Sequence, residues 1–94
     1  MSELLDKEWS DEQDYLLAKD LIGGLIALRA EWIYAEEKKL LPDQVLIEKW
    51  VNEQGDLDDW RKNLPWSDNP IVKGAIDAAL RKLDLEDPER QKKP

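Results

Sequence analysis

The residues best suited to chemistry in this chain are carboxylates, because the 94-residue sequence contains neither histidine nor cysteine. Those two types supply the commonest general base near neutral pH and the commonest nitrogen and sulfur ligands of transition metals. Any catalytic or metal site would therefore depend on oxygen ligands. The densest acidic cluster consists of Asp56, Asp58 and Asp59, which are spaced like the opening of a calcium loop.

The acidic cluster does not continue as a metal-binding loop. Trp60 and Lys62 stand where ligands are needed, and no glutamate closes the loop. Glu53 and Asp56 match only half of an acidic magnesium motif, whose other half, two glutamates three residues apart on an earlier helix, is missing. We therefore predict no catalytic residue, metal or cofactor. The three aspartates are expected to begin a helix or to contact a partner, and a carboxylate-based metalloenzyme is the least favoured alternative.

Tryptophan is the second unusual feature, since it accounts for five of the seven aromatic residues. Tryptophan is common in binding hot spots because it buries a large apolar area and keeps one polar group. Helical spacing places Trp32, Trp50 and Trp60 on apolar faces, where we expect them to pack in the core. Trp66 belongs to no helical face and lies in an acidic loop, so Trp66 and Trp9 are candidate contacts with a partner protein.

The charge of the chain limits its partners. The net charge is −8, with six acids and one base in residues 1–14 and seven acids and three bases in residues 41–70. Direct binding to nucleic acid or to an anionic membrane is disfavoured, because both require clustered Lys and Arg. An electrostatic partner should be basic. The N-terminus is acidic and charges interrupt the apolar run at 16–35, so we predict neither a signal peptide nor a membrane span, and a cytoplasmic location.

All the elements that position these residues are predicted to be helices. Ser10 and Gln13 form a capping box, and no proline occurs before Pro42, so the first helix is expected over residues 11–40. Such a helix is about 45 Å long, whereas a compact chain of this length has a radius of gyration of about 12 Å. Gly23 and Gly24 could break the helix. The apolar positions keep their phase through both glycines, which favours one helix, straight or kinked.

The apolar arc of this first helix covers about half of its circumference, which indicates that it is covered from two sides. Either other helices of the same chain or a second copy could provide the cover. Arg29 lies within the arc and needs a carboxylate partner there, so we expect an intramolecular ion pair. The candidate positions for helix packing or for a homodimer are Leu21, Gly24, Leu25, Leu28 and Trp32.

Three further helices are predicted, over residues 42–54, 56–64 and 70–83. Pro42 and Pro70 are favourable in a first helical turn, and Gly55 is placed to end the second helix as a left-handed cap. The expected fold is a small all-α bundle of about four helices. We expect residues 1–84 to form one domain, with 1–9 as a partly ordered arm, and 85–94 to be a disordered charged tail.

These features favour a non-catalytic module that binds another protein, as an accessory, regulatory or inhibitory factor. The main alternative is an acidic mimic of nucleic acid that inhibits a nucleic-acid-binding protein. That alternative predicts a continuous acidic face, because such a mimic must present a focused negative field.

Overall fold

The computed structural model describes the backbone of residues 3–66 and 68–91 and the side chains of residues 10–66 and 68–90. Three helices, α1 (Glu3–Glu37), α2 (Gln44–Lys62) and α3 (Asn69–Glu86), are followed by a single turn, α4 (Pro88–Gln91). No strand occurs within these described ranges. The predicted all-α fold with a long first helix is confirmed.

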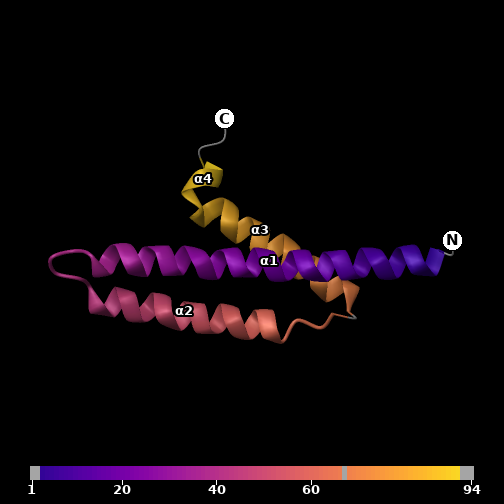
Figure 1. Ribbon diagram of the computed structural model, residues 1–94, viewed down its shortest axis with the longest axis horizontal. Coiled ribbons are helices and arrows are strands. Elements are labelled where there is room, and N and C mark those ends of the chain that lie inside the picture. Colours follow the sequence, from indigo (N-terminus) through magenta and orange to yellow (C-terminus); the bar gives the residue numbers. More distant parts are fainter. Residues whose placement is uncertain (1–2, 67, 92–94) are drawn as a thin grey trace.

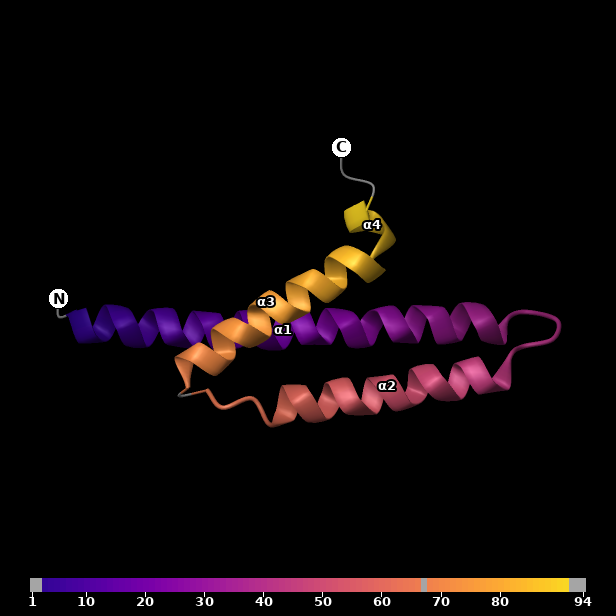
Figure 2. The ribbon, with the colours of Figure 1, turned by 180° about the vertical axis from the view of Figure 1, so that it is seen from behind.

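Helix α1 is the spine of the molecule. Its 35 residues extend for about 52 Å at the usual helical rise, with α2 antiparallel beside it and α3 crossing it obliquely (Figures 1 and 2). Helices α2 and α3 each pack on α1, and within the described ranges the backbones of α2 and α3 do not approach each other closely. The wide apolar arc of α1 is therefore covered from two sides by helices of the same chain.

The core consists of two clusters along α1. The larger cluster joins α1 to α2 and α3 and contains Ile22, Leu25, Leu28, Leu57, Ala79 and Leu83. The smaller cluster contains Ala18, Leu64, Val72 and Ala75. The Trp60 ring packs against both clusters. Ala18 and Ala79 are fully buried, and their small side chains allow the α1 and α3 backbones to approach closely.

Helix α1 differs from the prediction at both ends, because it begins at Glu3 rather than at residue 11 and ends at Glu37 rather than at 40. Ser10 lies inside the helix, so the predicted capping box was wrong; serine is only mildly unfavourable in a helix interior. The helix continues through Gly23 and Gly24, and no described glycine has a positive φ. None of the described helices is both long and apolar enough to cross a lipid bilayer.

Helix α2 is one continuous element, so the separate helix predicted over 56–64 was wrong. Gly55 is in its interior with a negative φ and does not act as a left-handed cap. The reason is tertiary: Trp50, Leu57 and Trp60 follow helical spacing across Gly55 and are all half-buried or buried. Asp43 caps the helix by accepting a 3.1 Å hydrogen bond from the Leu46 backbone N–H.

Helix α3 begins at Asn69, where the Asp68 carboxylate accepts a hydrogen bond from the Ile71 backbone N–H, and it ends at Glu86 instead of at 83. Together with α4 it makes most of residues 85–91 helical, where a disordered charged tail was expected over residues 85–94. Ion pairs that the sequence did not reveal support this region, including Arg90 with Asp84 at 3.2 Å. Residues 92–94 lie outside the described residues.

The molecule is long and thin, with extents of 61 × 34 × 16 Å and a radius of gyration of 16.5 Å. Helix α3 crosses α1 at its middle, so the turn between α1 and α2 stands clear of α3 in both views (Figures 1 and 2). We call this part, residues 30–52, the hairpin end.

Candidate functional site

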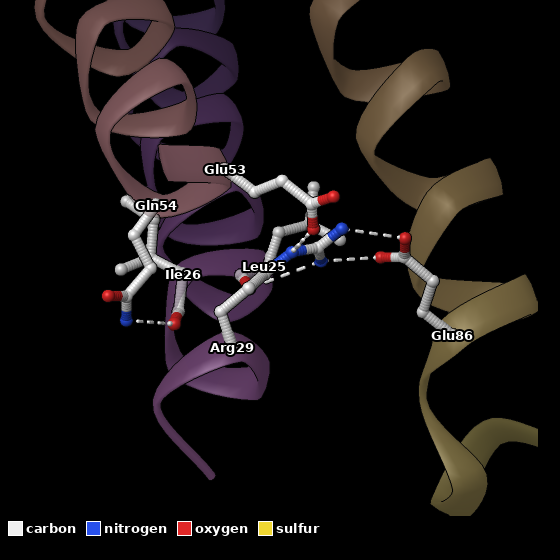
Figure 3. Close-up of polar contacts among 6 residues, drawn as sticks. All are labelled: Leu25, Ile26, Arg29, Glu53, Gln54 and Glu86. Carbon is white, nitrogen blue, oxygen red and sulfur yellow. Dashed lines mark hydrogen bonds and ion pairs between the residues drawn. The ribbon is translucent and has the colours of Figure 1, made fainter. Parts of the chain in front are cut away.

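Arg29 joins all three long helices (Figure 3). Its side chain is buried, and its guanidinium donates to Glu53 Oε1 of α2 at 3.2 Å and to both carboxylate oxygens of Glu86 of α3 at 2.7 and 2.8 Å. The bidentate pair with Glu86 is the stronger geometry. The predicted intramolecular ion pair is confirmed, and it has two acceptors on two different helices.

Hydrogen bonding within this pair shifts both pKa values toward the charged forms. The hydrogen bonds from Arg29 hold the pKa of Glu86 below its ordinary value, and those to Glu86 raise the pKa of Arg29. Both groups therefore remain charged near neutral pH. The same guanidinium lies 4.9 Å from the Trp32 ring, which connects this ion pair to the aromatic side chains of the hairpin end.

Glu36 fixes the turn between α1 and α2. Its carboxylate is only 5% exposed and accepts hydrogen bonds from Lys39 Nζ at 2.8 Å and from the Asp43 backbone N–H at 3.0 Å. Both hydrogen bonds lower the pKa of Glu36, and the bond from Lys39 has the larger effect. One carboxylate thus ties the end of α1 to the start of α2, so the intervening loop is held in place.

The residues displayed by this fixed loop are apolar. Leu40 is 98% exposed, Leu41 is 88% exposed, and Val45 at the start of α2 is 79% exposed. Sequence reasoning missed all three, because the helical pattern assigned Leu40 to the end of the first helix. The available signal was two adjacent leucines directly before Pro42, where no helix continues to bury them.

A shallow apolar hollow of about 390 Å³ lies beside this loop, lined by Trp32, Ala35, Glu36, Lys39 and Trp50. The Trp32 and Trp50 ring centroids are 5.6 Å apart, with the rings tilted by 54°. Both rings are half-buried. Trp32 packs against the larger core cluster, as predicted, whereas Trp50 is in neither cluster. The hairpin end therefore combines exposed leucines with a hollow that two contacting aromatic rings line on one side.

The tryptophans predicted to contact a partner are separated from this surface. Trp66 is 63% exposed in the loop between α2 and α3, at the opposite end of α2. The side chain of Trp9 lies outside the described side chains, so its role stays a prediction. Trp60 packs between the two core clusters, in agreement with its predicted place.

The three aspartates lie along the C-terminal half of α2, not at a helix start as expected. Asp58 forms an ion pair with Lys62 at 2.7 Å, and this hydrogen bond raises the pKa of Lys62. Asp56 lines a polar depression that also contains Arg29 and Glu53, whereas Asp59 faces solvent. Among the side chains of residues 10–66 and 68–90, no group of three or more carboxylates is arranged to hold a metal ion.

The residues predicted to pack helices together make contacts within the same chain. Leu25 and Leu28 are buried in the larger cluster, Trp32 contacts Trp50, and Leu83 lies close to Gly24. Leu21 is half-buried and lines a groove with Gly24. A homodimer through this stripe would have to displace α2 or α3.

A second open surface lies where α1 meets the end of α3 and α4, with a volume of about 390 Å³. We call it the acid-rimmed groove. It is lined by Leu21, Gly24 and Ala27 of α1 and by four acids, Asp20, Glu31, Asp87 and Glu89, together with one base, Arg90. Asp87 directly precedes α4, and its carboxylate accepts a hydrogen bond from the Glu89 backbone N–H in that helix.

Two open surfaces therefore remain as candidate binding sites, the apolar hairpin end and the acid-rimmed groove. They are distinct in chemistry, since the first presents leucine and tryptophan and the second presents carboxylates. Comparison of the chain with protein-family models, curated proteins and solved structures gives no match.

Proposed function

We propose that this chain is a non-catalytic protein-interaction module, an accessory, regulatory or inhibitory factor that binds a protein through its hairpin end. The observation that carries the proposal is the near-complete exposure of Leu40 and Leu41, at 98% and 88%. Single exposed apolar residues are normal on a protein surface, whereas several gathered on one projection are typical of an interface.

Three properties of the hairpin end suit it to binding. The loop is held by the buried Glu36 carboxylate, so little conformational entropy is lost when a partner orders it. The hollow lined by Trp32 and Trp50 can receive an apolar side chain of the partner. Tryptophan-lined pockets at the centre of an apolar patch are the common form of a binding hot spot.

The test is a comparison of proteins that co-purify with the tagged chain and with two variants from cells that express it. Leu40→Asp with Leu41→Asp should reduce recovery of specific partners by at least about tenfold, because burying two new carboxylates in an apolar contact is costly. The matched control is Trp66→Asp with Ile71→Asp, which adds the same charge at positions that are 63% and 51% exposed. Unchanged recovery with the Leu40 and Leu41 variant would refute the proposal.

The acid-rimmed groove favours a second candidate function, inhibition of a nucleic-acid-binding protein by charge mimicry. Asp20 and Glu31 are exposed on its rim and form no ion pair with any described residue. A basic partner held there should be released at moderate salt, because screening weakens exposed charge contacts. Asp20→Asn with Glu31→Gln should abolish that salt-sensitive fraction, while Glu48→Gln with Asp59→Asn should preserve it. Partners that resist high salt in every variant would rule out the mimic.

A further inference from the structure

We infer that the partner at the hairpin end is a second copy of this chain, packed about a two-fold axis so that two α1–α2 hairpins form a four-helix arrangement. This inference rests on the proposed binding role of the same surface.

The hairpin end is an incomplete bundle. Beyond Arg29, α1 and α2 pair without a third long helix, because α3 ends at Glu86, which contacts Arg29 (Figures 1 and 3). Two helices cannot enclose a core, and the apolar side chains of this part stay open to different degrees: Ile33, Leu46, Ile47 and Trp50 are half-buried, while Tyr34 and Val51 are exposed. Two such hairpins packed together can close a four-helix core.

The hairpin end is also self-complementary. A two-fold interface places the same patch on both copies, so the patch must contain both parts of each contact. The hairpin end contains both, since the exposed Leu40 and Leu41 follow directly on Lys39, which lines the hollow of about 390 Å³ together with Trp32 and Trp50. A two-fold rotation can bring the leucines of each copy to the hollow of the other.

Charge also bears on the identity of the partner. The chain carries a net charge of −8, so two copies repel each other over most of their surface. The hairpin end as a whole is acidic as well, with five acids and three lysines in residues 30–52, but all three lysines lie within residues 38–50, against Asp43 and Glu48. Repulsion between two copies is therefore reduced at the tip of the hairpin, where Leu40 and Leu41 are exposed.

The exposed surface area of the chain also favours pairing. The chain exposes 6929 Å², whereas a compact monomer of 11.0 kDa exposes about 5,600 Å². The excess of about 1,300 Å² exceeds the roughly 800 Å² that each partner buries in a stable interface of standard size. Pairing at the hairpin end would therefore bring the exposed area closer to that of an ordinary globular chain.

The experiment is a mass measurement by light scattering or sedimentation equilibrium between about 1 and 100 µM. We expect the wild-type chain to approach twice its monomer mass, and the Leu40→Asp, Leu41→Asp variant to remain monomeric with unchanged helicity by circular dichroism. The control variant Trp66→Asp, Ile71→Asp should dimerise like the wild type. A wild-type chain that is monomeric at about 100 µM overturns the inference, as do two variants that behave alike.

A second measurement does not depend on those variants. The chain has no cysteine, so a Leu40→Cys variant treated with a short thiol crosslinker should give a covalent dimer and a Trp66→Cys variant should not. Equal crosslinking of both also contradicts the inference. If the wild type is monomeric but loses co-purifying proteins when Leu40 and Leu41 are changed, the proposed function stands and only the identity of the partner is wrong.

Discussion

At the scale of single residues, Arg29 is the connection on which the arrangement of the helices depends. A buried guanidinium is tolerated only when its hydrogen bonds are satisfied, and here Glu53 of α2 and Glu86 of α3 provide them from two different helices. Such a pair adds specificity more than net stability. It fixes the position of α3 along α1, because only one register brings Glu86 to Arg29.

The two acceptors of Arg29 should differ in their effect on stability. We expect Glu86→Gln to lower the free energy of unfolding by about 1–2 kcal/mol, because it removes a bidentate charged contact from a buried guanidinium. Glu53→Gln, which loses one contact of 3.2 Å, should cost less than about 1 kcal/mol. Urea unfolding of both variants tests this order, with the exposed Glu48→Gln as the control. Equal costs would show that the bidentate geometry contributes nothing.

The lowered pKa values predict how stability depends on pH. A carboxyl group whose pKa is lower in the folded chain contributes stability above its unfolded pKa, and that contribution is lost as pH falls through the folded value. Glu86 and Glu36 both have pKa values below the ordinary 4.5. The melting temperature should therefore be nearly constant from pH 7 to pH 5 and fall below about pH 4.5. The fall should be shallower in Glu86→Gln, and an equally steep fall would contradict the assignment.

At the scale of elements, Gly55 separates two descriptions of α2. Replacing glycine by alanine lowers the stability of a protein where the glycine is a left-handed cap. The same replacement raises stability where the glycine lies inside a helix. Gly55 has a negative φ, and an added Cβ would meet nothing within 4 Å.

We therefore expect Gly55→Ala to raise the free energy of unfolding by up to about 1 kcal/mol, measured by urea unfolding. Gly23→Ala is the matched comparison, since its added Cβ also meets nothing within 4 Å. If Gly55→Ala lowered the free energy of unfolding while Gly23→Ala did not, the prediction of two separate helices, 42–54 and 56–64, would be supported instead.

Local signals in the sequence were sufficient for some elements and not for others. Pro70 and the apolar spacing of α3 predicted that helix almost to its ends, because proline position and periodicity are properties of neighbouring residues. Gly55 could not be interpreted in this way, since the same residue suits a cap or an interior and the packing of Leu57 and Trp60 on α1 decides. The hairpin end was missed for a related reason: exposure of Leu40 follows from where α1 stops, which Glu36 determines through the later residue Asp43.

At the scale of the whole molecule, α2 and α3 both pack on α1, but only part of α1 is covered. Its buried side chains run from Ala18 to Glu36 within residues 10–37, where side chains are described. Local opening costs little where few apolar contacts are lost. The first turns of α1 are therefore expected to be less stable than its middle.

Amide hydrogen exchange should reveal this difference within one helix. We expect amides of residues 8–14 to exchange at least about 100-fold faster than those of residues 22–33, because the latter open only when α2 and α3 are displaced. Mass spectrometry of peptides from the exchanged chain measures both regions, with the α2 peptide around Leu57 as a protected reference. Uniform protection along α1 would mean that its N-terminal turns are covered by another surface.

The thinness of the molecule also governs how it moves through a solvent. Its longest extent, 61 Å, is nearly four times its shortest, 16 Å, so its friction exceeds that of a sphere of equal mass. A monomer will leave a sizing column early and resemble a heavier globule, while its sedimentation will be slow for the same reason. Elution alone therefore overestimates the mass of the particle, and sedimentation velocity alone underestimates it. Combining the two measurements cancels the influence of shape and yields the number of chains in the particle.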